Sequence, residues 1–182
     1  MAPQMLHRVI HGSASPEPWQ KATLKFQPAV LHGYRRHRVR GADYPGIVLA
    51  EKATESSSAS PSSSRTSVLG TLVSGLTDGD VHRLDIYEGS EYVRERVAVR
   101  TLGKASPHTE SASEPTDSSG NGDLRNVLDA ASSEATDEGE EVEAVTYVWV
   151  AGKNLLEPAE WDYETFKKDK LAWWVSRDES EW

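Results

Sequence analysis

The chain has 182 residues, a length typical of one domain built around one hydrophobic core. It contains no cysteine, which excludes disulfides, thiolate metal sites and cysteine nucleophiles and suits a cytoplasmic protein. The net charge is −9, and residues 103–142 supply −8 of it through ten acidic and two basic residues. The rest of the chain therefore gives no overall electrostatic attraction for nucleic acid or an anionic membrane, and we expect neither as a partner.

The first segments predict short, locally defined elements. A helix is expected over residues 1–12, with Gly12 as the residue that ends it. Residues 19–26 are expected to form a short helix or a strand whose Trp19 and Leu24 reach the core.

Residues 28–39 are expected to form one strand that carries a dense basic segment. The segment could contact phosphates or RNA, with Tyr34 available for stacking, or it could be a solvent-facing strand edge on which charges discourage further pairing. We favour the edge, because the segment is only one strand long and the protein is acidic. The basic residues are Arg35, Arg36, His37, Arg38 and Arg40.

Two stretches of low complexity interrupt an otherwise continuous domain that we expect to span residues 1–182. Residues 53–67 are rich in serine, and residues 103–142 are acidic and rich in serine. Neither stretch keeps an apolar period, so both are expected to be disordered inserts that loop out between strands.

The segment around which the chain is organised runs from residue 68 to residue 100. It predicts a strand over residues 68–73 and then a helix with Thr77 as its N-cap. Gly89 is expected to end this helix, so that Glu88 is its last residue. A second strand is expected to follow, interrupted near Glu95.

Glu88 is the principal candidate for chemistry. A carboxylate at a helix C-terminus lies against the negative end of the dipole, and partial burial would raise its pKa further, toward that of a useful general base. The alternative is that Glu88 merely pairs with a nearby arginine on the surface, for which the candidates are Arg83, Arg94 and Arg96.

The C-terminal part predicts a strand and a helix. Residues 143–151 are apolar on both faces, which is typical of a strand in the centre of a sheet. A single C-terminal helix is expected from Trp161 onward, covering the core and fraying after Arg177, rather than contacting a partner or a membrane surface through Trp173 and Trp182.

Four short stretches together resemble the gamma-glutamylcyclotransferase-like family, also called the avirulence-induced-gene-like family. The resemblance covers roughly residues 1–52, 68–102 and 142–166. The stretches that carry it are Leu84-Asp85-Ile86-Tyr87-Glu88-Gly89, Glu91-Tyr92-Val93-Arg94, Tyr44-Pro45-Gly46 and Trp161-Asp162.

The resemblance implies an α+β fold, a small mixed β-barrel of about six strands with flanking helices. It implies an acyl transfer in which a γ-glutamyl substrate cyclises to 5-oxoproline and releases an amine. Glu88 would be the general acid and base, and Tyr92 and Tyr44 would contact the substrate. No cofactor is implied, and since His32 and His37 have no third ligand near them, no metal site is expected.

One element of the family pattern is not found. In the family, a strand ending in a Tyr-Gly-Thr-Leu-type loop precedes the first helix and holds the substrate's polar end through backbone N–H groups. Gly70-Thr71-Leu72 lies within the strand expected at residues 68–73 and is not its equivalent. Two explanations stay open, a start codon assigned too late or a genuinely shortened product, and we favour the first because losing an interior strand exposes backbone groups.

A different class of function also stays open. The same fold could be catalytically inactive and serve as a module that binds a ligand or a protein through its basic strand and its acidic insert.

Overall fold

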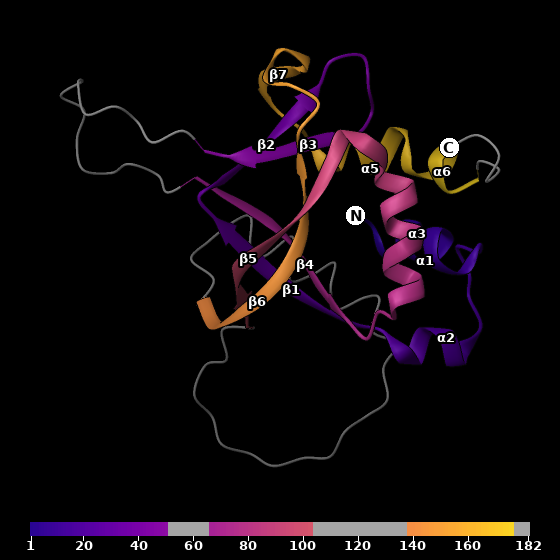
Figure 1. Ribbon diagram of the computed structural model, residues 1–182. Coiled ribbons are helices and arrows are strands. Elements are labelled where there is room, and N and C mark those ends of the chain that lie inside the picture. Colours follow the sequence, from indigo (N-terminus) through magenta and orange to yellow (C-terminus); the bar gives the residue numbers. More distant parts are fainter. Residues whose placement is uncertain (51–65, 104–137, 177–182) are drawn as a thin grey trace.

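The computed structural model describes residues 1–50, 66–103 and 138–176. Figure 1 shows a sheet region on one side and helices on the other. The helices are α1 (Pro3–His11), α2 (Pro18–Thr23), α3 (Asp78–Glu88), α5 (Tyr163–Asp169) and α6 (Leu171–Ser176), with short 3-10 turns η1 (Gly89–Glu91) and η2 (Lys153–Leu155). The strands are β1 (Lys25–His32), β2 (Tyr34–Val39), β3 (Pro45–Leu49), β4 (Ser67–Ser74), β5 (Tyr92–Leu102), β6 (Glu138–Trp149) and β7 (Leu156–Glu160).

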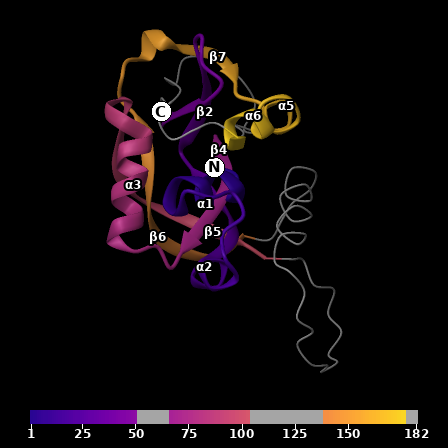
Figure 2. The same ribbon diagram turned by 90° about the vertical axis from the view of Figure 1, so that its right-hand side faces the viewer.

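The strands form two sheets, and the expected α+β fold is confirmed. The larger sheet has the order β4-β1-β5-β6 and the smaller one β3-β2-β7. Each pairing between these strands is antiparallel. The helices α1, α2 and α3 gather on one side of the larger sheet, as Figures 1 and 2 both show.

The core consists of two apolar clusters. Ile10 of α1 is completely buried and packs with Leu6, Leu24 and Leu84, so α1 is fixed against α3. A second cluster joins the two sheets: residues of β1 and β5 pack against Ile47 of β3. No helix among the described residues is long and apolar enough to cross a membrane.

The helix ends follow the sequence prediction closely. Gly12 ends α1 in the left-handed region (φ 69°), and its N–H donates to the carbonyl of Arg8. The Thr77 hydroxyl accepts from the Asp80 N–H at 3.2 Å, and the Asp80 carboxylate accepts from the Thr77 N–H at 2.9 Å, a reciprocal capping box. As predicted, α3 ends at Glu88.

The expected single strand over residues 28–39 is wrong. Gly33 adopts φ 78° and separates β1 from β2, which belong to different sheets. The basic strand β2 is not a sheet edge either, because it lies between β3 and β7. Strand β7 was not expected, since its Leu-Glu-Pro-Ala-Glu sequence has little β propensity and is held by pairing with β2.

Four other expectations need correction. Strand β6 is at the edge of its sheet, and Val145 at its middle is 58% exposed; its apolar character reflects packing at one end, where Trp149 is buried. Trp19 is 69% exposed, although Leu24 is buried as predicted. Strand β5 continues through Glu95 without interruption, and the C-terminal helix is divided at Lys170 into α5 and α6.

The ends of the two predicted inserts can be placed, but most of their residues lie outside the described ones. Strand β6 begins at Glu138, so residues 138–142 belong to the sheet rather than to the acidic insert. The expected fraying after Arg177 and the position of Trp182 also fall outside the described residues.

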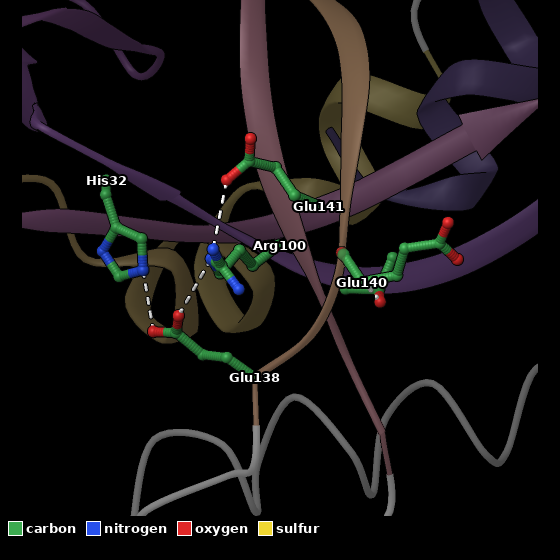
Figure 3. A network of polar contacts seen from close by, with 6 residues as sticks. His32, Arg100, Glu138, Glu140 and Glu141 are labelled. Carbon is green, nitrogen blue, oxygen red and sulfur yellow. Dashed lines mark hydrogen bonds and ion pairs between the residues drawn. The ribbon is translucent and has the colours of Figure 1, made fainter.

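A network of polar contacts ties three strands together where β5 ends and β6 begins (Figure 3). His32 of β1 contacts the Glu138 carboxylate at 2.7 Å. Arg100 of β5 reaches Glu138 at 3.6 Å and Glu141 at 3.2 Å. All four side chains are between about a third and three fifths exposed, so the network consists of solvated ion pairs.

Candidate functional site

The corner between α3 and β5 holds the candidate residues. Helix α3 ends at Glu88, Gly89 reverses the chain with φ 66°, and one 3-10 turn leads to Tyr92 at the start of β5. Only glycine adopts such a positive φ readily, so the Glu-Gly pair fixes where the helix stops and where the carboxylate projects.

Glu88 does not make the surface ion pair considered as its alternative. Each of the three candidate arginines is engaged elsewhere. Among the described residues, no side chain forms a hydrogen bond or ion pair with the Glu88 carboxylate. The arginine contacts are Arg83 to the carbonyl oxygen of Ile10, Arg94 to Asp85 at 3.1 Å and Arg96 to Glu143 at 3.4 Å.

Burial raises the pKa of Glu88 to about 7, and the positive charge of the Met1 α-amino group partly opposes this shift. A raised pKa agrees with the sequence prediction, with removal from water as the main cause. In turn, burial lowers the pKa of the Met1 amino group, Arg36 lowers it further, and Glu88 raises it. The amino group is therefore subject to opposite electrostatic effects from a basic and an acidic side chain.

Tyr44 and Tyr92, the two predicted substrate contacts, hold together the corner at which α3 ends in Glu88. The Tyr92 hydroxyl donates to the carbonyl of Pro45 at 2.8 Å, and the Tyr44 hydroxyl donates to Glu91 at 3.0 Å. These bonds cross between the start of β3 and the α3–β5 corner, so residues far apart in sequence form one wall.

Tyr92 also interacts electrostatically with Glu88. Burial raises the pKa of Tyr92, and the charges of Glu88, Tyr44, Glu91 and Tyr87 add to this shift. Burial likewise raises the pKa of Tyr44, with further contributions from Glu91. Both hydroxyls therefore stay protonated at neutral pH, and because each hydrogen is already donated, the oxygens are left to accept hydrogen bonds.

Aromatic packing fixes the orientation of this wall. Trp149 at the end of β6 meets the Tyr92 ring edge to face at 5.3 Å, and Trp174 of α6 meets Tyr44 in the same way at 6.3 Å. Gly46 allows the close approach of β3, since a Cβ there would lie 2.9 Å from Leu156 and 3.1 Å from Trp149. Close packing against Leu156 and Trp149 therefore explains why the Tyr-Pro-Gly stretch has a glycine at this position.

A groove on the outer side of β5 and β6 reaches this corner. Gly89 and Tyr92 line it, together with Arg94, Val145 and Tyr147. Glu88 is not part of its lining, so the groove borders the candidate site without containing the carboxylate.

Sequence reasoning missed two features of the site. The charge interaction between the Met1 amino group and Glu88 could not have been predicted without the packing of α1 on α3. Arg36 was treated as one of a solvent-facing row, yet it points inward to the carbonyl oxygen of Leu69 on β4. The alternation of β2 offers the only signal, because neighbouring residues of a strand face opposite sides.

The sequence matches a known protein family. Residues 7–113, more than half of the chain, match the family described as gamma-glutamyl cyclotransferase, AIG2-like. The chain belongs to this family. The expected resemblance is thereby confirmed.

Curated relatives come from Arabidopsis thaliana. Protein AIG2 C is 28% identical over 140 residues, covering 77% of this chain and 56% of the relative. Protein AIG2 B is 29% identical over 141 residues, covering 78% of this chain and 56% of the relative. The chain thus spans little more than half the length of these two family members.

Two solved structures from the same plant are similar. The solution structure of At3g28950.1 has a TM-score of 0.49 and 22% identity, covering 92% of this chain and 67% of that protein. The solution structure of At5g39720.1 has a TM-score of 0.42 and 24% identity, covering 79% of this chain and 65% of that protein.

Proposed function

We propose that this chain cyclises a γ-glutamyl group to 5-oxoproline and releases an amine, with Glu88 as general acid and base. The observation that carries the proposal is a carboxyl group with a pKa of about 7 that has no side-chain ion pair among the described residues. Such a group can take and return a proton at neutral pH. We also propose that the protein acts in the cytoplasm, since a chain without cysteine has no disulfide that would require an oxidising compartment.

The proton transfers balance in the following way. The Glu88 carboxylate takes one proton from the substrate's α-ammonium, and the free amine attacks the γ-carbonyl carbon to close a five-membered ring. As the bond from this carbon to the leaving nitrogen breaks, Glu88 returns its proton to that nitrogen. The ring nitrogen releases its second proton through solvent to the departing amine, which leaves as an ammonium ion.

The surroundings of Glu88 suit an ammonium group. The oxygens of Tyr44 and Tyr92 can accept hydrogen bonds, and aromatic rings attract cations. Ring closure within one molecule then needs little more than correct orientation.

The groove beside the corner supports the release step. It is lined by Tyr92, Arg94 and Tyr147, and it opens next to the end of α3. We propose that the amine or amino acid part of the substrate extends into it.

The test is formation of 5-oxoproline from γ-glutamyl dipeptides and γ-glutamyl amines, measured by mass spectrometry. Glu88→Gln is expected to lower kcat/KM by roughly 100-fold or more, because general acid and base catalysis is removed. Glu143→Gln is the matched control, since this carboxylate is exposed and pairs only with Arg96 among the described residues. It should retain the activity of the unaltered chain.

Two results would contradict the proposal. Full activity in Glu88→Gln would remove Glu88 from the mechanism. Binding of γ-glutamyl compounds without any turnover would indicate a ligand-binding module of the same fold.

A further inference from the structure

Strand β6 is the longest edge strand of the described structure. It has 12 residues, it is last in the order β4-β1-β5-β6, and among the described residues it pairs with β5 alone. The other edge strands are shorter, with eight residues in β4 and five each in β3 and β7. Strand β3 approaches β6 at one end, where Gly46 lies against Trp149. An edge strand of this length offers N–H and C=O groups to an extended chain beside it.

The ladder with β5 identifies which peptide groups of β6 point outward. The Val150 N–H donates to the Glu91 carbonyl at 2.8 Å, so these two residues form a hydrogen-bonded pair at the end of the ladder. In an antiparallel ladder such pairs alternate with pairs whose N–H and C=O groups point away from each other. The register is unbroken from Trp149 to Glu141, so every second residue directs its peptide groups away from β5. Before Trp149, these outward residues are Glu141, Glu143, Val145 and Tyr147.

The outward residues make one part of this edge acidic and the other part apolar. Their side chains lie on one face, because they alternate along the strand. The ion pair between Glu143 and Arg96 is 3.4 Å long and joins side chains that are 76% and 82% exposed, so it contributes little. Val145 is 58% exposed and has no charge that would discourage a neighbouring strand. The edge therefore presents both a carboxylate and an apolar side chain to a partner.

Charge complementarity indicates which kind of chain fits this edge. Residues 104–137 of the same chain carry seven acidic and two basic residues, so they would add repulsion. A second copy paired about Val145 would place Glu143 opposite Tyr147, and the glutamate would gain no cation. A peptide with cationic residues at one end and apolar residues at the other complements both parts of the edge.

We propose that β6 binds an extended, partly basic peptide as an antiparallel fifth strand of the larger sheet. The main chain of the peptide pairs with the outward groups of β6, and its alternate side chains give specificity. Because the peptide runs opposite to β6, its residues facing Tyr147 and Val145 come first and are apolar. Its residues facing Glu143 and Glu141 follow and are cationic. The pattern recognised is apolar-x-apolar-x-cation-x-cation.

The probe is the fluorescein-labelled peptide amide Val-Thr-Val-Thr-Arg-Thr-Arg, which has this pattern. Its affinity for the full chain is measured by fluorescence anisotropy at low ionic strength. Replacing both arginines of the peptide by glutamate should weaken binding by roughly tenfold or more, because two attractive cross-strand pairs become repulsive.

N-methylation of the peptide separates strand addition from general electrostatic attraction. Methyl groups on the nitrogens of the second valine and the first arginine remove two donors that face β6. They should weaken binding by roughly 30-fold or more, since two hydrogen bonds are lost and the methyl groups obstruct the approach. The matched control is N-methylation of the second and third threonines, whose N–H groups point away from β6, and it should have a much smaller effect.

Two variants of the protein test the position of the peptide. Val145→Lys keeps the backbone of β6 and places a cation in the middle of the edge, so binding of the basic peptide should weaken by roughly tenfold. Leu49→Lys makes the same change in charge at the end of β3, where the leucine is 65% exposed, and should leave the affinity unchanged.

Three results would overturn the proposal. The first is an affinity that falls equally with both patterns of N-methylation, which would indicate attraction by charge alone. The second is no binding of the unmodified peptide. The third is self-association of the unaltered chain that Val145→Lys abolishes, since the edge would then be occupied by a second copy. Sedimentation equilibrium of the unaltered chain and of this variant measures the self-association.

Discussion

Strand β5 has a glutamate near each end, and the two are used differently. Glu88 precedes the start of β5, is half-buried, has no ion pair among the described residues, and has a pKa raised to about 7. Glu138 pairs across the sheet with Leu102 at the other end, and its carboxylate contacts His32 and Arg100. The same side chain is a candidate proton carrier at one end and an ordinary partner in a surface network at the other. The difference lies in access to water and to cations, which residue type does not determine.

The largest expected effect is on the pH dependence of catalysis. Because the base must be ionised, kcat/KM for a γ-glutamyl dipeptide should rise with pH with an apparent pKa of about 7. At pH 5 the value should be roughly 100-fold below its plateau. Glu138→Gln should show the same profile. An activity that stays constant down to pH 5 would break the distinction between the two glutamates.

A second prediction concerns stability. The pKa of Glu88 is about 7 in the folded chain and near 4.5 when unfolded, so the folded state binds more protons between these values. The free energy of unfolding therefore falls as pH rises from 4.5 to 7. Glu88→Gln, which cannot ionise, should be more stable than the unaltered chain by roughly 2 kcal/mol at pH 8, after allowance for partial exposure, and equally stable at pH 4.

Urea unfolding at the two pH values measures this difference. Glu138→Gln is the control and should lower stability at pH 8 by less than about 1 kcal/mol, since it only removes solvated pairs. A gain in stability from Glu138→Gln, or a loss from Glu88→Gln at pH 8, would reverse the assignment of buried and solvated carboxylates.

A third, smaller effect is expected at the site wall. Tyr92→Phe removes the hydrogen bond to Pro45 and an acceptor for the substrate ammonium, so stability should fall by about 1 kcal/mol and kcat/KM by roughly five- to tenfold. Tyr34→Phe is the matched control, because its hydroxyl makes an exposed bond to Glu95 at 3.3 Å. Equal losses of activity in both variants would argue against a specific place for Tyr92.

The smallest effect is expected in the network of Figure 3. His32→Gln should change stability by less than about 1 kcal/mol, and about 1 M NaCl should abolish the difference, because exposed ion pairs are screened. Thermal unfolding at low and high salt measures it. A large, salt-independent loss would mean that the Glu138 carboxylate is as strongly shielded from water as the Glu88 carboxylate.

The sequence predicted the structure correctly where the interacting residues are close together along the chain. The capping box at Thr77 and the stop at Gly89 follow from neighbouring residues, and both fix the position of Glu88. Assignments that depend on partners far along the chain were less successful. Strand β7 exists because β2 pairs with it, and Trp19 is exposed because nothing packs over α2 at that point in the described structure.

The sequence by itself determined where α3 ends, that a glutamate stands at that end, and which tyrosines accompany it. Only the tertiary structure decided that the neighbouring arginines turn to other partners, that the hydroxyls of Tyr44 and Tyr92 join the start of β3 to the α3–β5 corner, and that Arg36 faces inward. The physical reason is the distance along the chain between the residues that interact. Helix caps and turns depend on hydrogen bonds between residues a few positions apart. Removal of a carboxylate from water depends on every surface that packs around it.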